Sequence, residues 1–216
     1  VQAEGGIYPF TPEFLKDCRA FCDKNGILLI VDDIQAGCAR TGTFFSFERG
    51  GIKPDMVALS KSIGGVGMPM ALLLIDPEKD IWKPAEHNGT FRGNQLAFVA
   101  GKAALEYMVD HELEKETRRK GVIVENFLKN EILPMDSRLS YRGIGLMWGI
   151  DCAALGGDRF SEAVVDACFK RNLILERAGR NSSVVKLMPT LVIDDETLNR
   201  GLAILKEAFQ EVLANS

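Results

Sequence analysis

The sequence predicts an α/β fold that consists of part of a large, mainly parallel-sheet domain and a small α+β domain at the C-terminus. Two apolar, β-branched runs end in a charged residue, Asp32 in the first and Lys61 shortly after the second. Such runs are typical of strands buried in a parallel sheet. The first run directly follows an amphipathic stretch, so helix and strand alternate. The carboxyl edge of such a sheet is where α/β proteins bind ligands.

The first predicted helix begins after Thr11, whose hydroxyl can cap the free amides, and Pro12 suits the first helical position because it has no amide to satisfy. It is expected to end at about Asn25, where Gly26 supplies a left-handed stop. A strand over Ile27–Val31 follows at once, which makes a helix and then a parallel strand.

The next predicted elements are a strand over Met56–Leu59, an apolar run over Met70–Ile75 and a helix over Asn94–Met108. A glycine-rich loop that contains an arginine, Gly37–Gly42, precedes them. Small residues along the Asn94–Met108 helix predict close packing on a neighbour.

Charged residues accumulate from Asp110 to Lys120, and we place a domain boundary there. Residues 1–110 then form the C-terminal part of the large domain and residues 111–216 the small domain. The small domain is predicted to hold helices over Gly121–Ile132, Phe160–Arg171 and Asp195–Leu213, and strands over Tyr141–Cys152, Leu173–Leu175 and Val184–Leu187. Because the chain starts with a glycine-rich turn and not with Met, we expect it to be part of a longer protein.

The composition excludes several classes of function. A chain of 216 residues with a net charge of −4 has neither a nucleic-acid footprint nor a polybasic membrane patch, and no apolar run is long enough to cross a bilayer. The start, VQAEGG, has neither a basic head nor an apolar signal core, so we expect a cytoplasmic protein. Five scattered cysteines indicate reduced, mostly buried thiols. Cys18 and Cys22 lie on one helical face, but with only His87 and His111 in the chain, core cysteines are favoured over a metal site.

Asp32 and Lys61 together suit one cofactor, pyridoxal phosphate, which needs a carboxylate at its ring nitrogen and a lysine for its aldehyde. A buried Asp32 would keep the ring nitrogen protonated, and partial desolvation would make the amine of Lys61 nucleophilic. Asp33 competes with Asp32, but neighbouring strand residues point in opposite directions, so one of the two faces the ring and Asp33 is expected to bond loop amides. Ile34 could cover one ring face and Gln35 could donate to the phenolic oxygen. A Ser-Lys dipeptide alone is typical of a surface lysine; its pairing with Asp32 favours the cofactor.

The segments VDDIQAGCARTG, LSKS and GTFRGN resemble, in this order, the signature of the class III pyridoxal-phosphate-dependent aminotransferases. VQAEGG and VKLMPTLVI are similar to two further segments of that family, so the resemblance covers essentially the whole chain. It implies a fold-type I transferase with a large cofactor-binding domain. EHNGTFRGNQLAFV and VVKLMP are most similar to the branch that acts on 2,4-diaminobutyrate and 2-oxoglutarate in ectoine synthesis.

The resemblance implies Lys61 as the covalent attachment point, Asp32 at the ring nitrogen, Ile34 against the ring and Gln35 near its phenolic oxygen. It also implies that Thr90 reaches the phosphate of the cofactor held by the other subunit, so the active unit is a homodimer, or a larger oligomer, with shared sites. From the residues alone, Thr90 is only a hydroxyl in a glycine-flanked turn. The family places the residues that hold the phosphate upstream of Val1, so this fragment alone is expected to lack them.

Three residues depart from the family pattern. Ala3 replaces a glycine and Asp33 replaces a glutamate. Lys186 is found where most of the family has an arginine that binds a substrate α-carboxylate. A lysine cannot reproduce the planar fork of arginine. We hypothesise a switch in which Glu4 neutralises Lys186 while a diamine is bound and releases it for the dicarboxylate. The alternative is a strand lysine that points to solvent.

The predicted reaction is ping-pong transfer of the terminal amino group of 2,4-diaminobutyrate to 2-oxoglutarate, in which Lys61 moves the proton. Enzymes that use ornithine, 4-aminobutyrate or the diaminobutyrate of siderophore pathways are alternatives with the same chemistry. A catalytically silent, truncated relative that serves as a dimerisation partner is the alternative from another class.

Overall fold

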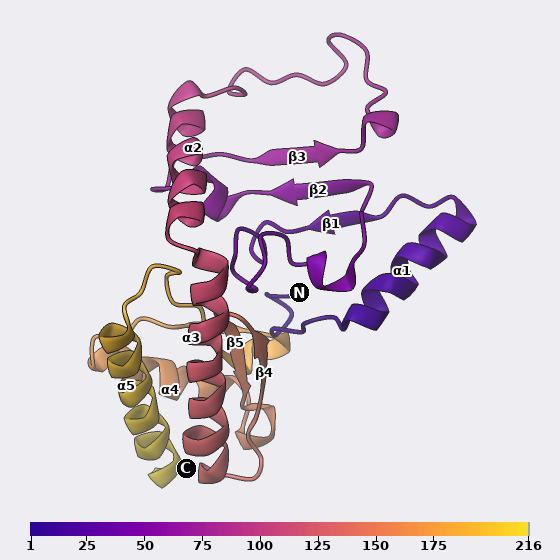
Figure 1. The fold of residues 1–216 in the computed structure, drawn as a ribbon. Coiled ribbons are helices and arrows are strands. Elements are labelled where there is room, and N and C mark those ends of the chain that lie inside the picture. Colours follow the sequence, from indigo (N-terminus) through magenta and orange to yellow (C-terminus); the bar gives the residue numbers. More distant parts are fainter. Residues whose placement is uncertain (216) are drawn as a thin grey trace. The chain divides into compact units, whose positions relative to one another are not determined.

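The computed structural model describes residues 1–215 as two compact units (Figure 1). The first, called here the N-terminal unit, consists of residues 10–39 and 43–114. The second, the C-terminal unit, consists of residues 1–9, 40–42 and, among the described residues, 115–215. Two short segments of the first half of the chain therefore belong to the C-terminal unit. The assignment of a large domain over 1–110 and a small domain over 111–216 stays a prediction.

The N-terminal unit is built on a three-stranded sheet with the order β1-β2-β3. Its strands are β1 (Ile30–Asp32), β2 (Met56–Leu59) and β3 (Leu72–Ile75), and its helices are α1 (Pro12–Asn25) and α2 (Gln95–Asp110). β1 and β2 are parallel, as predicted, and β3 runs antiparallel to β2. The three strands lie side by side in Figure 1.

The predicted ends of α1 are confirmed. The amide of Phe14 donates to the Thr11 hydroxyl at 3.1 Å, and Gly26 is left-handed with φ of 63°. The predicted start of the next strand is wrong, because β1 begins at Ile30. The amide of Leu29 donates to the carboxylate of Asp55 at 2.7 Å. This backbone N–H is therefore bonded to a side chain and not to a neighbouring strand, and pairing of β1 with β2 begins one residue later.

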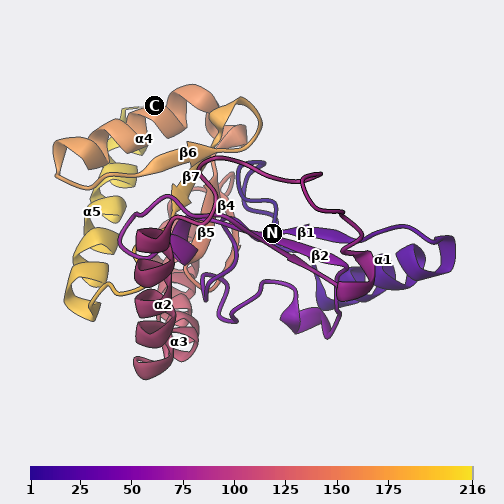
Figure 2. The same ribbon diagram turned by 90° about the horizontal axis from the view of Figure 1, so that it is seen from above.

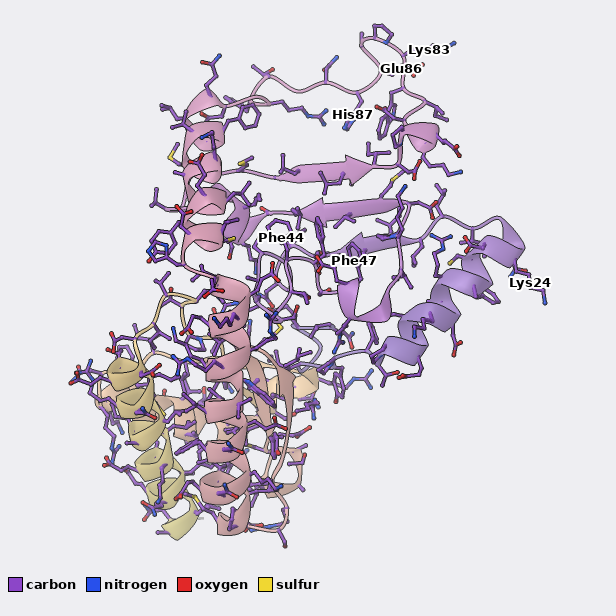
Figure 3. The ribbon with its side chains drawn as sticks, viewed as in Figure 1. Lys24, Phe44, Phe47, Lys83, Glu86 and His87 are labelled. Carbon is purple, nitrogen blue, oxygen red and sulfur yellow. The ribbon has the colours of Figure 1, made fainter. Side chains whose placement is uncertain are left out.

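The core of the N-terminal unit lies against β2. Its buried members are Cys38, Phe47, Val57, Leu59 and Ile63, and Phe44 packs against them. Figure 3 labels Phe44 and Phe47 in this core, close to β1 and β2.

Close packing of α2 on a neighbour, predicted from its small residues, is confirmed. A Cβ at Gly101 would lie 2.8 Å from the carbonyl oxygen of Ile63, and one at Gly65 would lie 2.7 Å from that of Ala100. The absence of both side chains lets α2 contact the turn that carries Lys61.

The C-terminal unit holds a four-stranded antiparallel sheet with the order β4-β5-β7-β6. Its strands are β4 (Ser140–Ile144), β5 (Met147–Asp151), β6 (Glu176–Ala178) and β7 (Val184–Leu187). Its helices are α3 (Leu113–Phe127, with a π-helical turn over Leu128–Ile132), α4 (Asp158–Lys170) and α5 (Asp195–Ala214). Figure 2 shows α4 lying along β6 and β7.

Three predicted elements of this unit are corrected. Tyr141–Cys152 is a hairpin and not one strand, because Gly145 turns the chain with φ of 59°. The strand predicted at Leu173–Leu175 lies instead at Glu176–Ala178. Helix α3 starts at Leu113 and not at Gly121, so most of the charged run lies within a helix, where Arg119 pairs with Glu116.

Over residues 1–215, none of the helices has the length and apolar character needed to span a bilayer.

Candidate active site

Asp32 and Lys61 lie at the same end of two neighbouring parallel strands. In the ladder between β1 and β2, Asp32 is opposite Ala58, and Lys61 follows the end of β2. Parallel pairing therefore brings an acid and an amine to one sheet edge, as the sequence predicts.

Lys61 opens a short 3₁₀ turn, Lys61–Gly64, and has a positive φ of 50°. A residue other than glycine in this region costs roughly 1–3 kcal/mol and is held there by its surroundings. The hydroxyl of Ser60 donates to the carbonyl of Met70 at 2.8 Å, and Ile63 is buried in the core. These contacts fix the backbone of Lys61 in a strained conformation, which is a common feature of functional sites.

Asp32 and Asp33 occupy opposite environments, as strand alternation predicts. Asp32 is exposed, and one of its oxygens accepts the amide of Ile34 at 3.0 Å. Asp33 is 1% exposed, and its Oδ2 accepts the amide of Ser46 at 2.8 Å. Burial raises the pKa of the Asp33 carboxyl, although the bonds from Ser46 oppose the shift. The expected bonding of loop amides by Asp33 is confirmed.

The expectation that Asp32 is buried and the amine of Lys61 partly desolvated is wrong for this chain, because both residues are exposed. Asp32 ends the outermost strand of the sheet, and Lys61 stands on a turn beyond the end of β2. Both groups are open to a ligand.

The other predicted cofactor residues lie in the same unit. Ile34 and Gln35 are half-buried and directly follow Asp32. Thr90 is exposed in the loop between β3 and α2. Figure 3 labels Lys83, Glu86 and His87 along this loop. Among the described residues, no contact joins Thr90 to Asp32 or Lys61. Its role at the phosphate held by a second subunit stays a prediction.

Glu4 and Lys186 are brought together in the C-terminal unit. The Nζ of Lys186 lies 2.8 Å from an oxygen of Glu4 and 3.0 Å from an oxygen of Glu176. The Lys186 side chain is 1% exposed, so the alternative of a solvent-facing lysine is wrong. Burial lowers the pKa of the Lys186 ammonium, but the bonds to Glu4 and Glu176 outweigh burial and raise it above its ordinary value.

A turn at the start of the chain holds Glu4 over the sheet. Gln2 and Tyr8 form an isolated antiparallel bridge, and the carbonyl of Glu4 accepts the amide of Gly179 at 2.9 Å. Ile7 is fully buried in this turn, and a Cβ at Gly149 would lie 3.0 Å from its Cγ1. A glycine opposite Lys186 therefore makes room for the segment that carries Glu4.

Glu176 is the residue that the sequence reasoning missed. Glu176 lies directly opposite Lys186 in the β6–β7 ladder. Because the strand was predicted three residues too early, that register was not visible. An exposed acid at the cross-strand position of a buried lysine is the signal that finds it.

Glu4 also lines an open groove of about 1040 Å³ in the C-terminal unit. Tyr8 and Arg142 line it too, and the guanidinium of Arg142 stacks on the Tyr8 ring at 3.9 Å. Arg142 is also held by Asp151 at 2.9 Å. Within residues 1–215, no cluster of three or more His, Cys, Asp or Glu side chains could hold a metal ion.

Comparison with known proteins identifies the family of this chain. Residues 1–209 match the model of the family described as aminotransferase class-III. The chain belongs to the class III aminotransferases.

Curated relatives of this class III chain include two diaminobutyrate–2-oxoglutarate transaminases. That of Halalkalibacterium halodurans is 47% identical over 99% of this chain and 49% of the relative, and that of Sporosarcina pasteurii is 46% identical over 99% and 50%. An uncharacterised aminotransferase of Sinorhizobium fredii is 48% identical over 96% of this chain and 46% of the relative. The chain spans about half the length of the curated relatives it matches.

The fold is that of the fold-type I pyridoxal-phosphate-dependent aminotransferases. The ornithine aminotransferase of Toxoplasma gondii matches all of this chain with a TM-score of 0.93 and 27% identity, and the match covers 51% of that structure. The N-acetylornithine aminotransferase of Stenotrophomonas maltophilia matches with a TM-score of 0.85 and 31% identity, over 100% of this chain and 56% of that one.

The described residues of this class III chain fit the cofactor of such enzymes. An exposed carboxylate and an exposed amine follow neighbouring parallel strands, and the amine stands on a strained backbone held by Ser60. Both types of group that pyridoxal chemistry requires are therefore accessible at one sheet edge.

Proposed function

We propose that the protein containing this chain is a pyridoxal-phosphate-dependent aminotransferase that moves the terminal amino group of 2,4-diaminobutyrate to 2-oxoglutarate. The register of β1 and β2, which brings Asp32 and Lys61 to one sheet edge, is the observation that carries the proposal. The substrates are supported by the 46–47% identity to proteins named for this reaction, over nearly the whole chain.

When bound, pyridoxal phosphate supplies an electron sink that stabilises negative charge at the substrate carbon. In this proposal, Asp32 holds the ring nitrogen in its protonated form by charge attraction. Ile34 covers one face of the ring, and Gln35 donates to its phenolic oxygen.

Lys61 is the covalent attachment point in this proposal, and its Nζ takes up and returns the proton of the substrate once an incoming amine has displaced it. The backbone strain at Lys61 supports this role because it fixes the direction in which the side chain leaves the turn. In this proposal Glu4 neutralises Lys186 while a diamine is bound and releases it for the dicarboxylate.

We also propose a homodimer, or a larger oligomer, in which Thr90 reaches the phosphate held by the partner subunit. Its exposed position in the β3–α2 loop is compatible with this role. A cytoplasmic location is supported by the five cysteines, all free thiols in the structure. Ectoine synthesis is the pathway that we infer from the similarity to diaminobutyrate transaminases.

Ornithine transamination is a second candidate, favoured by the match to an ornithine aminotransferase structure at a TM-score of 0.93. The lower identity to that protein, 27%, ranks it behind diaminobutyrate.

A panel of amino donors tests the proposal with the whole protein that contains this chain. With 2-oxoglutarate as acceptor, kcat/KM is expected to be highest for 2,4-diaminobutyrate and lower for ornithine and 4-aminobutyrate. A higher value for ornithine would favour the second candidate. No transfer from any donor, with a visible spectrum that Lys61→Ala leaves unchanged, would favour a silent relative.

A further inference from the structure

We propose that Ser60 is a positioning residue that holds the amine of Lys61 in place for proton transfer, through the hydrogen bond from its hydroxyl to the carbonyl of Met70. This inference rests on the proposed function and goes beyond it, because it makes the reaction rate depend on a hydroxyl outside the reacting groups. All three residues lie in the N-terminal unit, so the arrangement is contained within one unit.

The backbone changes its conformation abruptly where β2 ends. Ser60 is extended, with φ of −159° and ψ of −153°, and Lys61 directly after it has φ of 50°. A side-chain-bearing residue is unfavourable in this left-handed region, so surrounding contacts must hold it there. If those contacts are lost, Lys61 relaxes toward negative φ and its Cβ points in a new direction. The amine then leaves the position that it shares with Asp32 at the sheet edge.

Most of the backbone bonds of the turn stay inside the turn. The amide of Ile63 donates to the carbonyl of Ser60 at 3.2 Å, and that of Gly65 donates to the carbonyl of Ser62 at 3.1 Å. The bond from the Ser60 hydroxyl to the Met70 carbonyl, at 2.8 Å, instead reaches a segment ten residues away. That segment leads into β3, which pairs with β2. The hydroxyl therefore ties the residue before Lys61 to the sheet.

Met70, whose carbonyl accepts this bond, is itself held between the turn and α2. A Cβ at Gly101 of α2 would lie 3.0 Å from the Sδ of Met70, and one at Gly64 would lie 3.5 Å from its Cβ. Met70 also packs against the buried core around Ile63. The acceptor is thus fixed from two sides, which gives the bond from Ser60 a rigid anchor.

This support bears on the rate more than on substrate binding. The Nζ of Lys61 must meet the proton of the substrate in one geometry, and a misplacement of about 1 Å can lower a rate about 100-fold. The population of the strained turn therefore sets kcat. Both substrates are bound by other groups, so KM does not depend on this population.

Ser60→Ala tests the inference in the whole protein that contains this chain. With 2,4-diaminobutyrate and 2-oxoglutarate, kcat is expected to fall about 3-fold to 10-fold, the effect of one lost hydrogen bond, and both KM values should stay unchanged. Ser60→Thr keeps the hydroxyl, and an extended backbone suits a β-branched residue, so kcat should be restored. If Ser60→Ala fails to fold, Ser60→Cys replaces it, because a thiol is only a weak donor.

Ser62→Ala is the matched control. Ser62 lies in the same turn, and within residues 1–215 its hydroxyl makes no hydrogen bond. This variant removes the same oxygen atom from a neighbouring position and should leave kcat unchanged.

Cofactor attachment provides a readout that does not depend on turnover. The protein without cofactor is mixed with pyridoxal phosphate, reduced with borohydride at timed intervals and mapped by peptide mass. Attachment at Lys61 should be slower in Ser60→Ala by about the same factor as kcat, and it should keep the wild-type rate in Ser60→Thr and Ser62→Ala.

A lower urea midpoint for Ser60→Ala, with kcat and the attachment rate unchanged, would assign Ser60 a structural role and overturn the inference. A loss that Ser60→Thr does not restore, or that Ser62→Ala shares, would also overturn it. Failure of the proposed function looks different, since the wild-type protein would then neither attach the cofactor at Lys61 nor transfer an amino group from any donor.

Discussion

The stability of the Glu4–Lys186–Glu176 cluster gives a prediction whose size follows from the structure. Lys186→Met removes the buried ammonium group and leaves two carboxylates that are more than 70% exposed. Water can solvate those acids, and exposed ion pairs contribute only about 0–1 kcal/mol. Because the ammonium group also no longer pays a desolvation cost, the free energy of unfolding should change by less than about 1 kcal/mol.

The double variant Glu4→Gln/Glu176→Gln removes the acids and leaves the ammonium group buried without a counter-charge. Breaking a buried pair in this way costs about 3–5 kcal/mol. We expect about 3 kcal/mol, at the low end, because the glutamine amide oxygens still accept hydrogen bonds from Lys186.

Urea denaturation of the whole protein, followed by circular dichroism at neutral pH, measures both values. The pKa of the Lys186 ammonium is raised, so its favourable contribution is present below the ordinary value of 10.5 and is lost as pH rises through the raised value. In the double variant only burial acts on this ammonium group and lowers its pKa, so the destabilisation of that variant should be largest at low pH and should shrink as the pH rises toward the ordinary value of 10.5. A loss on Lys186→Met as large as that of the double variant would refute the reasoning.

Three further predictions concern the fold and the buried groups. Gly145→Ala should destabilise the protein by about 1–2 kcal/mol or more, because Gly145 has φ of 59° and a Cβ there would lie 2.5 Å from the carbonyl oxygen of Arg40. The control Gly201→Ala in α5 should not destabilise it, and thermal unfolding of the two variants measures the difference. Thiol labelling of the native protein at mildly alkaline pH should modify Cys18 before Cys152. Cys18 is only half-buried, whereas Cys152 is buried and its burial raises the pKa of the thiol to about 12. Early modification of Cys152, detected by peptide mass mapping, would contradict this prediction. Asp33→Asn should stabilise the protein more at pH 7 than near pH 4. The pKa of the buried Asp33 carboxyl is raised, so its ionisation costs stability once the pH is above the ordinary pKa of 3.8, and asparagine removes that cost. Urea midpoints that show an equal or opposite effect at the two pH values would count against this prediction.

Helix boundaries marked by local signals were predicted well from the sequence. Thr11 and Gly26 bound α1 as expected. The helix predicted to begin at Asn94 begins at Gln95, and Asn94 is its cap, whose side chain accepts the amide of Leu96 at 3.0 Å. These caps depend on residues a few positions apart, so the sequence contains the whole interaction.

Strand boundaries depended on partners far along the chain and were predicted less well. The apolar residues Leu173–Leu175 favoured a strand, but Ile174 is 78% exposed and the ladder begins at Glu176. Glu176 and Arg177 are stable there because Lys186 and Asp158 supply opposite charges. Single-sequence patterns do not contain these contacts.

Some residues of the candidate site could also be predicted from local sequence signals, and others depended on contacts far along the chain. Asp32 and Lys61 could be predicted because each follows an apolar run, and parallel pairing brings the two runs together. The contact of Glu4 with Lys186 was proposed from a family resemblance. Glu176 required the β6–β7 register, which only the fold provides.

The central claim is that Lys61 binds pyridoxal phosphate covalently, and borohydride reduction followed by peptide mass mapping tests it most directly. The whole protein, loaded with the cofactor and reduced, should carry the reduced cofactor on the peptide that contains Lys61. Lys61→Ala should lose that label, and Lys53→Ala, which removes an exposed lysine paired with Asp76, should retain it. A label on another lysine, or no label with the cofactor present, would contradict the account.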